Sequence, residues 1–327
     1  MIAQRGQAPA KVNLTLEILG RREDGYHEIR SVVVPLALRD EVAAHVATPA
    51  MVRSRVGGSP DFVMARGLPA GPSEDNLVFR AVDLLRSTQS RPLPSLEMRL
   101  VKRIPVAAGL GGGSSDAAAA LELAAAAWSV PLGPVVLRRL AVALGSDVPF
   151  FTLRSWGMIS GRGEGLVRLP PTIDGPLGVL LITPDMRLST EAVYAAWDAA
   201  HRQEDKVAQR QNGATRARRT ATGTLAARLR SGLTAGELAE LAPANDLWPV
   251  AASLRPGLAQ IRTTIAALLD RPVHMTGSGT TLYVLYPAPE GARRAARLVR
   301  GAIEGSDRTY AGATRPTIIA TQTLGGA

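Results

Sequence analysis

The chain has 327 residues, 46% of them hydrophobic, a length and composition typical of a compact protein of two domains with a buried core. Cysteine is absent, which excludes disulfide bonds and cysteine-ligated metal sites and suits a reducing cytosol, so we expect a cytoplasmic protein. The N-terminus lacks the apolar run of a signal peptide, and the longest apolar stretch, around 117–128, is too short to span a bilayer. We therefore expect no membrane partner.

The net charge of +10 would suit a nucleic-acid partner, but the charge is unevenly distributed. Residues 201–236 hold eight Lys or Arg against two acids, so this segment carries six of the ten net positive charges. It is polar and weakly periodic, which predicts a solvated, flexible loop. An RNA-binding protein that uses this loop is one alternative. The segment contains no Phe, Tyr or Trp on which bases could stack, so we expect no nucleic-acid partner.

In chain order, strand and helix patterns alternate in the first half of the sequence. Val12, Leu14, Leu16 and Ile18 are separated by polar residues, which predicts a half-buried strand over 12–18. A turn at 22–25 separates it from a second strand over 29–38. The other expected elements are a helix over 76–87 with Asp75 as its N-cap, a strand over 96–100, an alanine-rich helix over 117–128 and a helix over 134–144 that ends at Gly145.

The second half mixes helices and strands without a strict alternation. A boundary is expected near Pro170–Pro171, which divides the chain into domains 1–168 and 169–327. Two such α+β domains favour a ligand site in the cleft between them. The expected strands are 178–183, 273–275, 282–286 and 317–323, and the expected helices are 189–201 with Ser189 as its cap, 235–241, 256–269 and 290–303.

Residues 104–116, I-P-V-A-A-G-L-G-G-G-S-S-D, form the most informative stretch of the chain. Glycines allow a backbone to approach a ligand closely, and the start of the following helix offers unpaired N–H groups and a positive dipole end. Together they predict a phosphate site, with a plain turn as the alternative. The Walker, Rossmann and protein-kinase motifs are all absent, so the site belongs to another architecture.

Three more segments carry residues suited to phosphoryl transfer. Lys11 and Asn13 share one face of the first strand, either in a site or in solvent. Asp147, in L-G-S-D-V-P-F-F, is either a carboxylate that orients an alcohol or a turn residue that caps its own backbone. T-G-S-G-T at 276–280 is either a second backbone contact with a ligand or a simple hairpin.

Taken together, P-A-K-V-N-L at 9–14, D-G-Y-H at 24–27, the glycine loop, L-G-S-D-V-P and T-G-S-G-T resemble the galactokinase/homoserine kinase/mevalonate kinase/phosphomevalonate kinase superfamily over nearly the whole chain. The D-G-Y-H element resembles the corresponding element of one branch of this superfamily. The kinases of that branch phosphorylate the 2-hydroxyl of a cytidine diphosphate-linked methylerythritol in the non-mevalonate route to isoprenoid precursors. The resemblance implies a two-domain α+β small-molecule kinase with an N-terminal ATP-side domain and a C-terminal ferredoxin-like domain. Kinases for mevalonate or homoserine, and a noncatalytic relative, are the alternatives within this superfamily.

The resemblance also implies roles for individual residues. Lys11 and Asp147 would be the catalytic pair, and ATP with Mg²⁺ would be the cofactors, with no metal ligand assigned. Asp116 would point away from the phosphates or act through Mg²⁺, and Asn245 and Asp246 match a family element without an assigned role. The ATP phosphates would contact Pro105, Val106, Ala107, Ala108, Gly109, Leu110, Gly111, Gly112, Gly113, Ser114 and Ser115. The cytidylyl substrate would contact Asn13, Tyr26, His27, Tyr194, Thr276, Gly277, Ser278 and Gly279.

Overall fold

The fold is described from a computed structural model. It describes residues 3–47, 61–68, 76–169, 173–210, 221–241, 244–304 and 315–325, without the side chains of Phe62 and residues 202–210. The chain forms two compact units, one from Met1–Lys11, Ala37–Val106 and Gly111–Arg154, the other from Val12–Leu36, Ala107–Leu110 and Ser155–Ala327. The expected α+β class is confirmed, whereas the boundary expected at Pro170–Pro171 lies outside the described residues.

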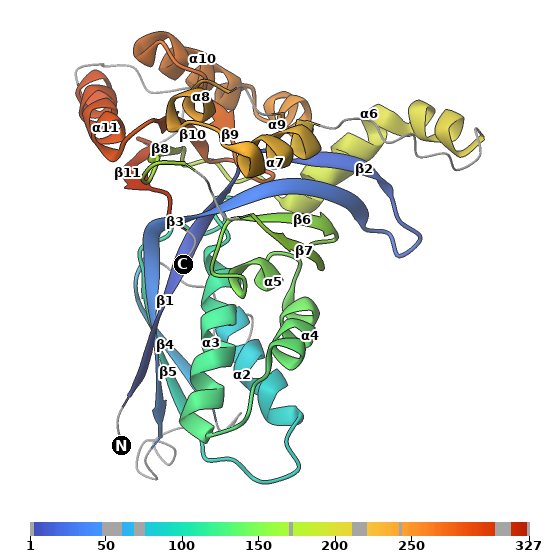
Figure 1. Cartoon of the computed structure of the whole chain (residues 1–327), viewed down its shortest axis with the longest axis vertical. Coiled ribbons are helices and arrows are strands. Elements are labelled where there is room, and N and C mark those ends of the chain that lie inside the picture. The colour runs from blue at the N-terminus through green and yellow to red at the C-terminus, as the bar shows by residue number, and fades with distance from the viewer. Residues whose placement is uncertain are drawn as a thin grey trace. The chain divides into compact units, whose positions relative to one another are not determined.

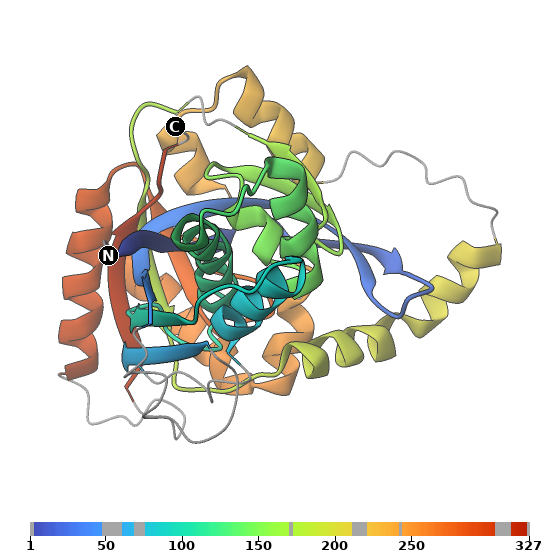
Figure 2. The same ribbon diagram turned by 90° about the horizontal axis from the view of Figure 1, so that it is seen from below.

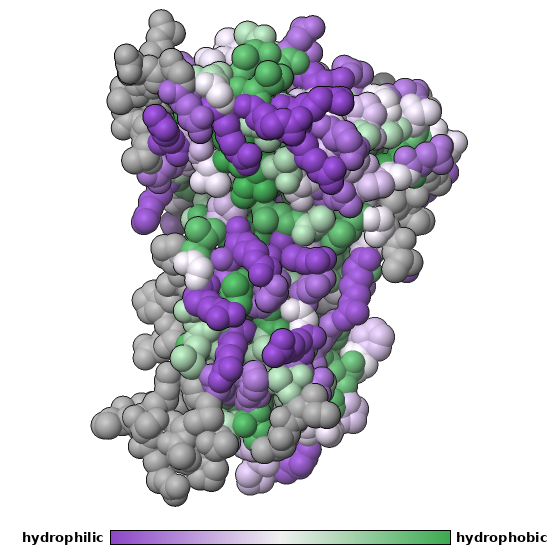
Figure 3. Space-filling view, turned by 90° about the vertical axis from the view of Figure 1, so that its left-hand side faces the viewer, coloured by the Kyte–Doolittle hydropathy of each residue, from purple (hydrophilic) through white to green (hydrophobic). Residues whose placement is uncertain are grey.

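The first unit is a sheet with helices on one face (Figure 1). β5 runs antiparallel to β3 and parallel to β4, and β1 also pairs with β3. Hydrophilic side chains spread over the other face of the sheet (Figure 3), where Arg5, Arg66 and Arg99 are among the residues that line a groove of about 650 Å³. The elements are β1 (Gln4–Asn13), the second half of β3 (His27–Val46), β4 (Phe62–Gly67), β5 (Leu96–Lys102), α2 (Leu77–Ser87), α3 (Gly112–Trp128), α4 (Pro134–Leu144) and α5 (Val148–Phe151).

The second unit contains two groups of strands. The first half of β3 pairs with β2 (Glu17–Arg21) and β6 (Gly157–Gly161), and β7 (Gly165–Arg168) pairs with β6. A separate antiparallel sheet has the order β11-β8-β10-β9, and α11 packs against β8 and β11 (Figures 1 and 2). These four strands are β8 (Gly178–Thr183), β9 (His274–Met275), β10 (Leu282–Tyr286) and β11 (Thr317–Gln322).

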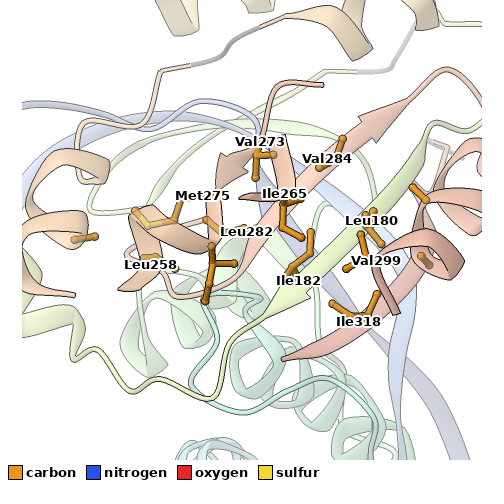
Figure 4. Packing of buried hydrophobic residues seen from close by; sticks show 14 of the residues in the cluster. Leu180, Ile182, Leu258, Ile265, Val273, Met275, Leu282, Val284, Val299 and Ile318 are labelled. Atoms are coloured by element: carbon orange, nitrogen blue, oxygen red, sulfur yellow. The ribbon is translucent and has the colours of Figure 1, made fainter. Parts of the chain in front are cut away.

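Helices of the second unit bury the apolar side chains of this antiparallel sheet. Leu180, Ile182 and Val284 from the strands contact Ile265 and Val299 from the helices in one cluster (Figure 4). None of the helices in the described residues is both long enough and apolar enough to cross a membrane. The helices are α6 (Thr190–Arg210), α7 (Ala221–Ser231), α8 (Ala235–Glu240), α9 (Trp248–Leu254), α10 (Pro256–Leu269) and α11 (Pro289–Glu304).

The strand predicted over 12–18 is wrong, because the chain leaves β1 after Asn13 and joins β2 only at Glu17. Between them, the N–H of Leu14 donates to the carbonyl of Val32 at 2.8 Å. Polar Thr15 is also buried, since its hydroxyl accepts the N–H of Val32 at 3.0 Å. The alternating pattern therefore reflects burial on both sides and not a half-exposed strand.

The basic segment 201–236 is not a continuous loop. α6 extends to Arg210, and α7 buries Thr222, Leu225 and Leu229. The many arginines of this segment favoured the prediction of a loop, although α7 has a buried apolar face. Residues 211–220 lie outside the described residues. Ser189 accepts the N–H of Ala192 as expected for the start of α6.

Other boundaries shift by local effects. α2 has Asn76 as its N-cap, whose side chain accepts the N–H of Val78 at 2.9 Å, while Asp75 is not described. α3 begins at Gly112, earlier than the alanine run indicated, because the glycines already adopt helical backbone. The short or edge elements β4, β6, β7, α5 and α9 lacked a recognisable pattern.

Candidate active site

Lys11 and Asp147 lie together in the first unit. β1 presents Lys11, whose side chain is only 4% exposed, and its Nζ lies 3.5 Å from Oδ2 of Asp147. Asp147 occupies the N-cap position of α5 but makes no capping hydrogen bond with its side chain, which contradicts the alternative of a backbone-capping turn residue. Burying an ammonium group is costly unless it is paired. The pair therefore presents a partly exposed carboxylate beside a buried positive charge.

The end of the glycine loop runs directly against this pair. Gly111 is the N-cap of α3 with a φ of 70°, a conformation that favours glycine. A Cβ at Gly111 would lie 2.9 Å from Cζ of Phe151 and 3.0 Å from Cγ of Lys11. No side chain can therefore be added where the loop passes Lys11.

The first turn of α3 has the features of an anion site. α3 has no side-chain cap, so the N–H groups of its first turn are open to a ligand. Ser115 Oγ is buried and has no hydrogen-bond partner within the described part of the chain. The structure thus places the N-cap of α3, Gly111, beside Lys11, and Gly112 to Ser115 follow it in the first turn of the helix.

The middle of the glycine loop contacts the T-G-S-G-T turn within the second unit. A Cβ at Gly109 would lie 2.7 Å from the carbonyl oxygen of Thr276 and 3.0 Å from that of Gly279. The N–H of Thr281 donates to the carbonyl of Ala108 at 3.4 Å. Two glycine-rich segments far apart in the sequence therefore meet backbone to backbone. Of the remaining loop residues, Val106 and Ala107 are exposed, Pro105 is partly buried and Leu110 is buried.

Asn13 is tied to the same turn. Its backbone N–H donates to Thr276 Oγ1 at 3.0 Å, the Thr276 hydroxyl donates to Asn13 Oδ1 at 3.2 Å, and Asn13 Nδ2 donates to Ser31 Oγ at 2.8 Å. Ser278 Oγ lies 2.9 Å from Thr190 Oγ1. Asn13 and Thr276 are buried and hydrogen-bonded to each other, so they connect the end of β1 to the turn.

Asn245 and Asp246, which the motif left without a role, anchor neighbouring backbone. Asn245 Nδ2 donates to the carbonyls of Met275 and Gly277 at 2.9 and 3.0 Å. Asp246 Oδ2 accepts the N–H of Ile18 at 2.8 Å. Both residues therefore support the T-G-S-G-T turn and β2.

Asp116 points into the first unit, where it joins a buried cluster. Lys102 Nζ donates to Asp116 Oδ2 at 2.7 Å and also to Asp40, whose other oxygen accepts the N–H of Ile104 at 2.9 Å. Burial and the nearby Asp40 raise the pKa of Asp116 to about 7, although Lys102 opposes the shift. The sequence offered one signal for this cluster, because Lys102 occupies an apolar position in the alternation of β5.

The D-G-Y-H element separates into two environments. Tyr26 is 54% exposed and so does not pack in the core, and the Arg162 guanidinium lies 4.6 Å from its ring centroid. His27 is almost buried, its ring centroid lies 4.7 Å from that of Tyr194, and its Nε2 lies 2.6 Å from Oδ1 of Asp198. The structure thus joins His27 with Tyr194, and Asp198 and Arg162 are neighbours that the motifs did not indicate.

Comparisons with known proteins find relatives over most of the chain. Residues 76–155 match the family described as GHMP kinases N terminal domain. The chain is 37% identical over 295 residues to the 4-diphosphocytidyl-2-C-methyl-D-erythritol kinase of Pelotomaculum thermopropionicum, which covers 90% of this chain and 92% of that protein. The enzyme of the same name from Parvibaculum lavamentivorans is 38% identical over 303 residues, covering 91% and 94% of the two chains.

Solved structures show the same relationship. A crystal structure of 4-(cytidine 5'-diphospho)-2C-methyl-D-erythritol kinase is 30% identical, has a TM-score of 0.70 and covers 98% of this chain and 100% of its own. Homoserine kinase from Cytophaga hutchinsonii, at 13% identity and a TM-score of 0.65 over 99% of this chain and 95% of its own, shares the fold. The extended identity to named kinases, together with the matching GHMP region, shows that the chain belongs to the 4-diphosphocytidyl-2-C-methyl-D-erythritol kinase family.

Proposed function

We propose that this kinase transfers the γ-phosphoryl group of ATP to the 2-hydroxyl of 4-diphosphocytidyl-2-C-methyl-D-erythritol. The observation that carries the proposal is the buried Lys11 ammonium, 3.5 Å from the Asp147 carboxylate and in contact with the glycine that starts α3. Phosphoryl transfer requires positioned phosphates, positive charge and a group that handles the hydroxyl proton. The start of α3, Lys11 and Asp147 are the candidates for these three requirements, and they lie close together in space.

The ATP phosphates are proposed to bind the loop from Pro105 to Ser115. Its support is the uncapped N-terminus of α3, where N–H groups and the helix dipole favour an anion. Glycine at 111 lets the backbone at the start of α3 pass close to Lys11, since any Cβ there would meet Lys11 and Phe151.

Asp147 is proposed to orient the acceptor hydroxyl and to take its proton. The hydroxyl oxygen then forms its bond to the γ-phosphorus while the bond from that phosphorus to the bridging oxygen breaks, and ADP leaves with the electron pair. Lys11 supplies positive charge to the transferring group, which is where charge stabilisation lowers the barrier. The partly exposed carboxylate of Asp147, at 39%, is accessible to a substrate.

Magnesium is proposed as part of the bound nucleotide. Mg²⁺ is usually held by one or two protein oxygens together with substrate phosphates. The buried Oγ of Ser115, which has no partner within the described residues, fits the protein oxygen in this pattern. When bound, Mg²⁺ offsets the negative charge of the phosphates. We propose that Ser115 and the ATP phosphates hold it.

The cytosine is proposed to contact Tyr26, His27 and Tyr194. An exposed tyrosine offers a stacking surface, and the His27 ring offers a hydrogen-bonding edge. Asn13 and residues 276–279 are proposed to support the diphosphate and sugar part through the backbone contacts described above.

A cytoplasmic location and the division into domains 1–168 and 169–327 are also proposed, the first supported by the absence of cysteine.

The test is ATP turnover by the purified chain with three acceptors: the cytidylyl methylerythritol, mevalonate and homoserine. We expect turnover with the first at least a hundredfold faster than with the others, because only that acceptor offers a cytosine to Tyr26 and His27. Preferential turnover of mevalonate or homoserine would overturn the substrate assignment while leaving the kinase class intact.

A further inference from the structure

One face of α6 is built around the His27 ring. Tyr194, Trp197, Asp198 and His201 follow the spacing that puts side chains on one side of a helix. The Tyr194 ring lies 4.7 Å from His27, the Trp197 ring lies 5.6 Å from it edge-on, and His201 stacks on Trp197 at 4.3 Å. Tyr194 and Trp197, from a helix far away in the sequence, thus pack against the imidazole, and His201 packs on Trp197.

Asp198 makes the polar contact within this group. Its Oδ1 lies 2.6 Å from His27 Nε2, and its Oδ2 lies 3.6 Å from the guanidinium of Arg21. Arg21 and His27 are directly opposed in the β2–β3 ladder, so both side chains stand on the same side of the hairpin. The His27 contact is almost buried, whereas Arg21 is 59% exposed, so the interaction with His27 is the stronger of the two.

A carboxylate on one imidazole nitrogen determines what the other nitrogen does. A carboxylate accepts and does not donate, so the contact with Asp198 favours the His27 tautomer that carries its proton on Nε2, in which Nδ1 is an acceptor. Cytosine presents an amino group, which donates, at the position where uracil presents a carbonyl oxygen, which accepts. An Nδ1 acceptor therefore pairs with the amino group of cytosine and faces a lone pair in uracil.

We propose that Asp198 is the residue that gives the site its preference for cytosine, by holding His27 in the tautomer whose Nδ1 accepts. Asp198 is a positioning residue, since it acts through His27. This inference rests on the proposed function, because it needs the base to meet His27. It predicts that base selectivity depends on Asp198, a residue of α6 that the motifs did not indicate.

The experiment compares cytidylyl and uridylyl methylerythritol as acceptors for the wild type, Asp198→Ala and Asp198→Asn. We expect Asp198→Ala to lower the ratio of kcat/KM for the two acceptors by about tenfold or more, chiefly through KM, with the KM for ATP unchanged. His27→Ala should lower the ratio similarly, and the double variant should lower it no further, because the two residues act as one unit. The matched control is Arg21→Met, which removes the weaker contact with the same carboxylate and should leave the ratio within about twofold.

The outcomes separate the two levels of inference. The wild type can show a clear preference for the cytidylyl over the uridylyl acceptor. If Asp198→Ala and Asp198→Asn then keep that full preference, the role of Asp198 alone is overturned. A wild type without turnover of the cytidylyl acceptor overturns the proposed function and this inference with it. If Asp198→Ala does not fold, the ¹⁵N chemical shifts of the His27 ring in the wild type decide, because the proposal requires the proton on Nε2 and a bare Nδ1.

Discussion

The site around Gly111 and the cluster around His27 are built in different ways. In the first unit, backbone shape dominates: a glycine with a left-handed φ passes Lys11 and Phe151 with no room for a methyl group. In the second unit, side chains dominate: three residues of α6, Tyr194, Trp197 and Asp198, contact one imidazole ring. A site made by backbone should lose function abruptly when an atom is added, and a site made by side chains should lose selectivity in steps.

The largest expected effect is at Lys11 and Asp147, the proposed catalytic pair. Asp147→Asn keeps the size of the side chain but removes the charge that takes the proton, so kcat should fall by roughly 10²–10⁴ with little change in either KM. Lys11→Met should also lower kcat strongly, and the double variant should lose less than the sum of the two effects. Steady-state kinetics of the three variants checks this. Near-normal kcat in Asp147→Asn would move the base role to another group.

The next effect tests the backbone-built site. Gly111→Val combines left-handed backbone strain with a side chain that meets Phe151 at 2.9 Å, so ATP affinity should fall by about a hundredfold. Gly133→Val is the matched control, because Gly133 is also a helix N-cap but has extended backbone and nothing within 4 Å of an added Cβ. Calorimetric titration of the folded variants with ATP measures both. Equal ATP affinity in the two variants would contradict the proposal that this loop binds the ATP phosphates.

A smaller effect is expected where side chains form the site. Tyr26→Ala should raise KM for the cytidylyl acceptor by about ten- to a hundredfold, since stacking of a base on an aromatic ring contributes roughly 1–3 kcal/mol. Tyr26→Phe keeps the ring and should restore most of the affinity. ATP affinity should remain unchanged in both. Acceptor KM values that do not respond to Tyr26→Ala would separate this residue from the cytosine.

The smallest effect concerns the buried cluster of Lys102, Asp40 and Asp116 near the start of α3. Asp116 ionises near 3.8 when exposed but near 7 when folded, so the folded state binds the additional proton between these values. The contribution of this group to the free energy of unfolding is therefore present below about pH 4 and lost as the pH rises to about 7. Asp116→Asn should remove that slope and become the more stable form near pH 7.

Denaturant unfolding from pH 4 to 8 measures this slope, with exposed Asp83→Asn as the control that keeps it. Parallel pH profiles of the wild type and Asp116→Asn would show that Asp116 is ionised in the folded protein throughout this range.

Much of the fold follows from short segments of sequence. β8, β10, α4 and α10 begin and end where their apolar patterns and glycine or proline limits predict, because each is governed by interactions between neighbours in the chain. The strand predicted over 12–18 is wrong because polar Thr15 is buried. Its hydrogen-bond partner, Val32, belongs to another strand and could not be seen in the local pattern. Charge misled the pattern for α7 in the same way, because the buried Leu225 and Leu229 were outweighed by nearby arginines.

The sequence by itself determined the family, and it supplied the glycine loop, Lys11, Asp147 and His27 as site candidates, because each belongs to a contiguous motif. Only the tertiary structure revealed Asp198 beside His27, Asp40 and Lys102 around Asp116, and the meeting of Gly109 with Thr276. These contacts join residues that are far apart in the chain and carry no shared motif. Hydrogen bonds and packing depend on distance in space, and that distance is decided by the fold as a whole.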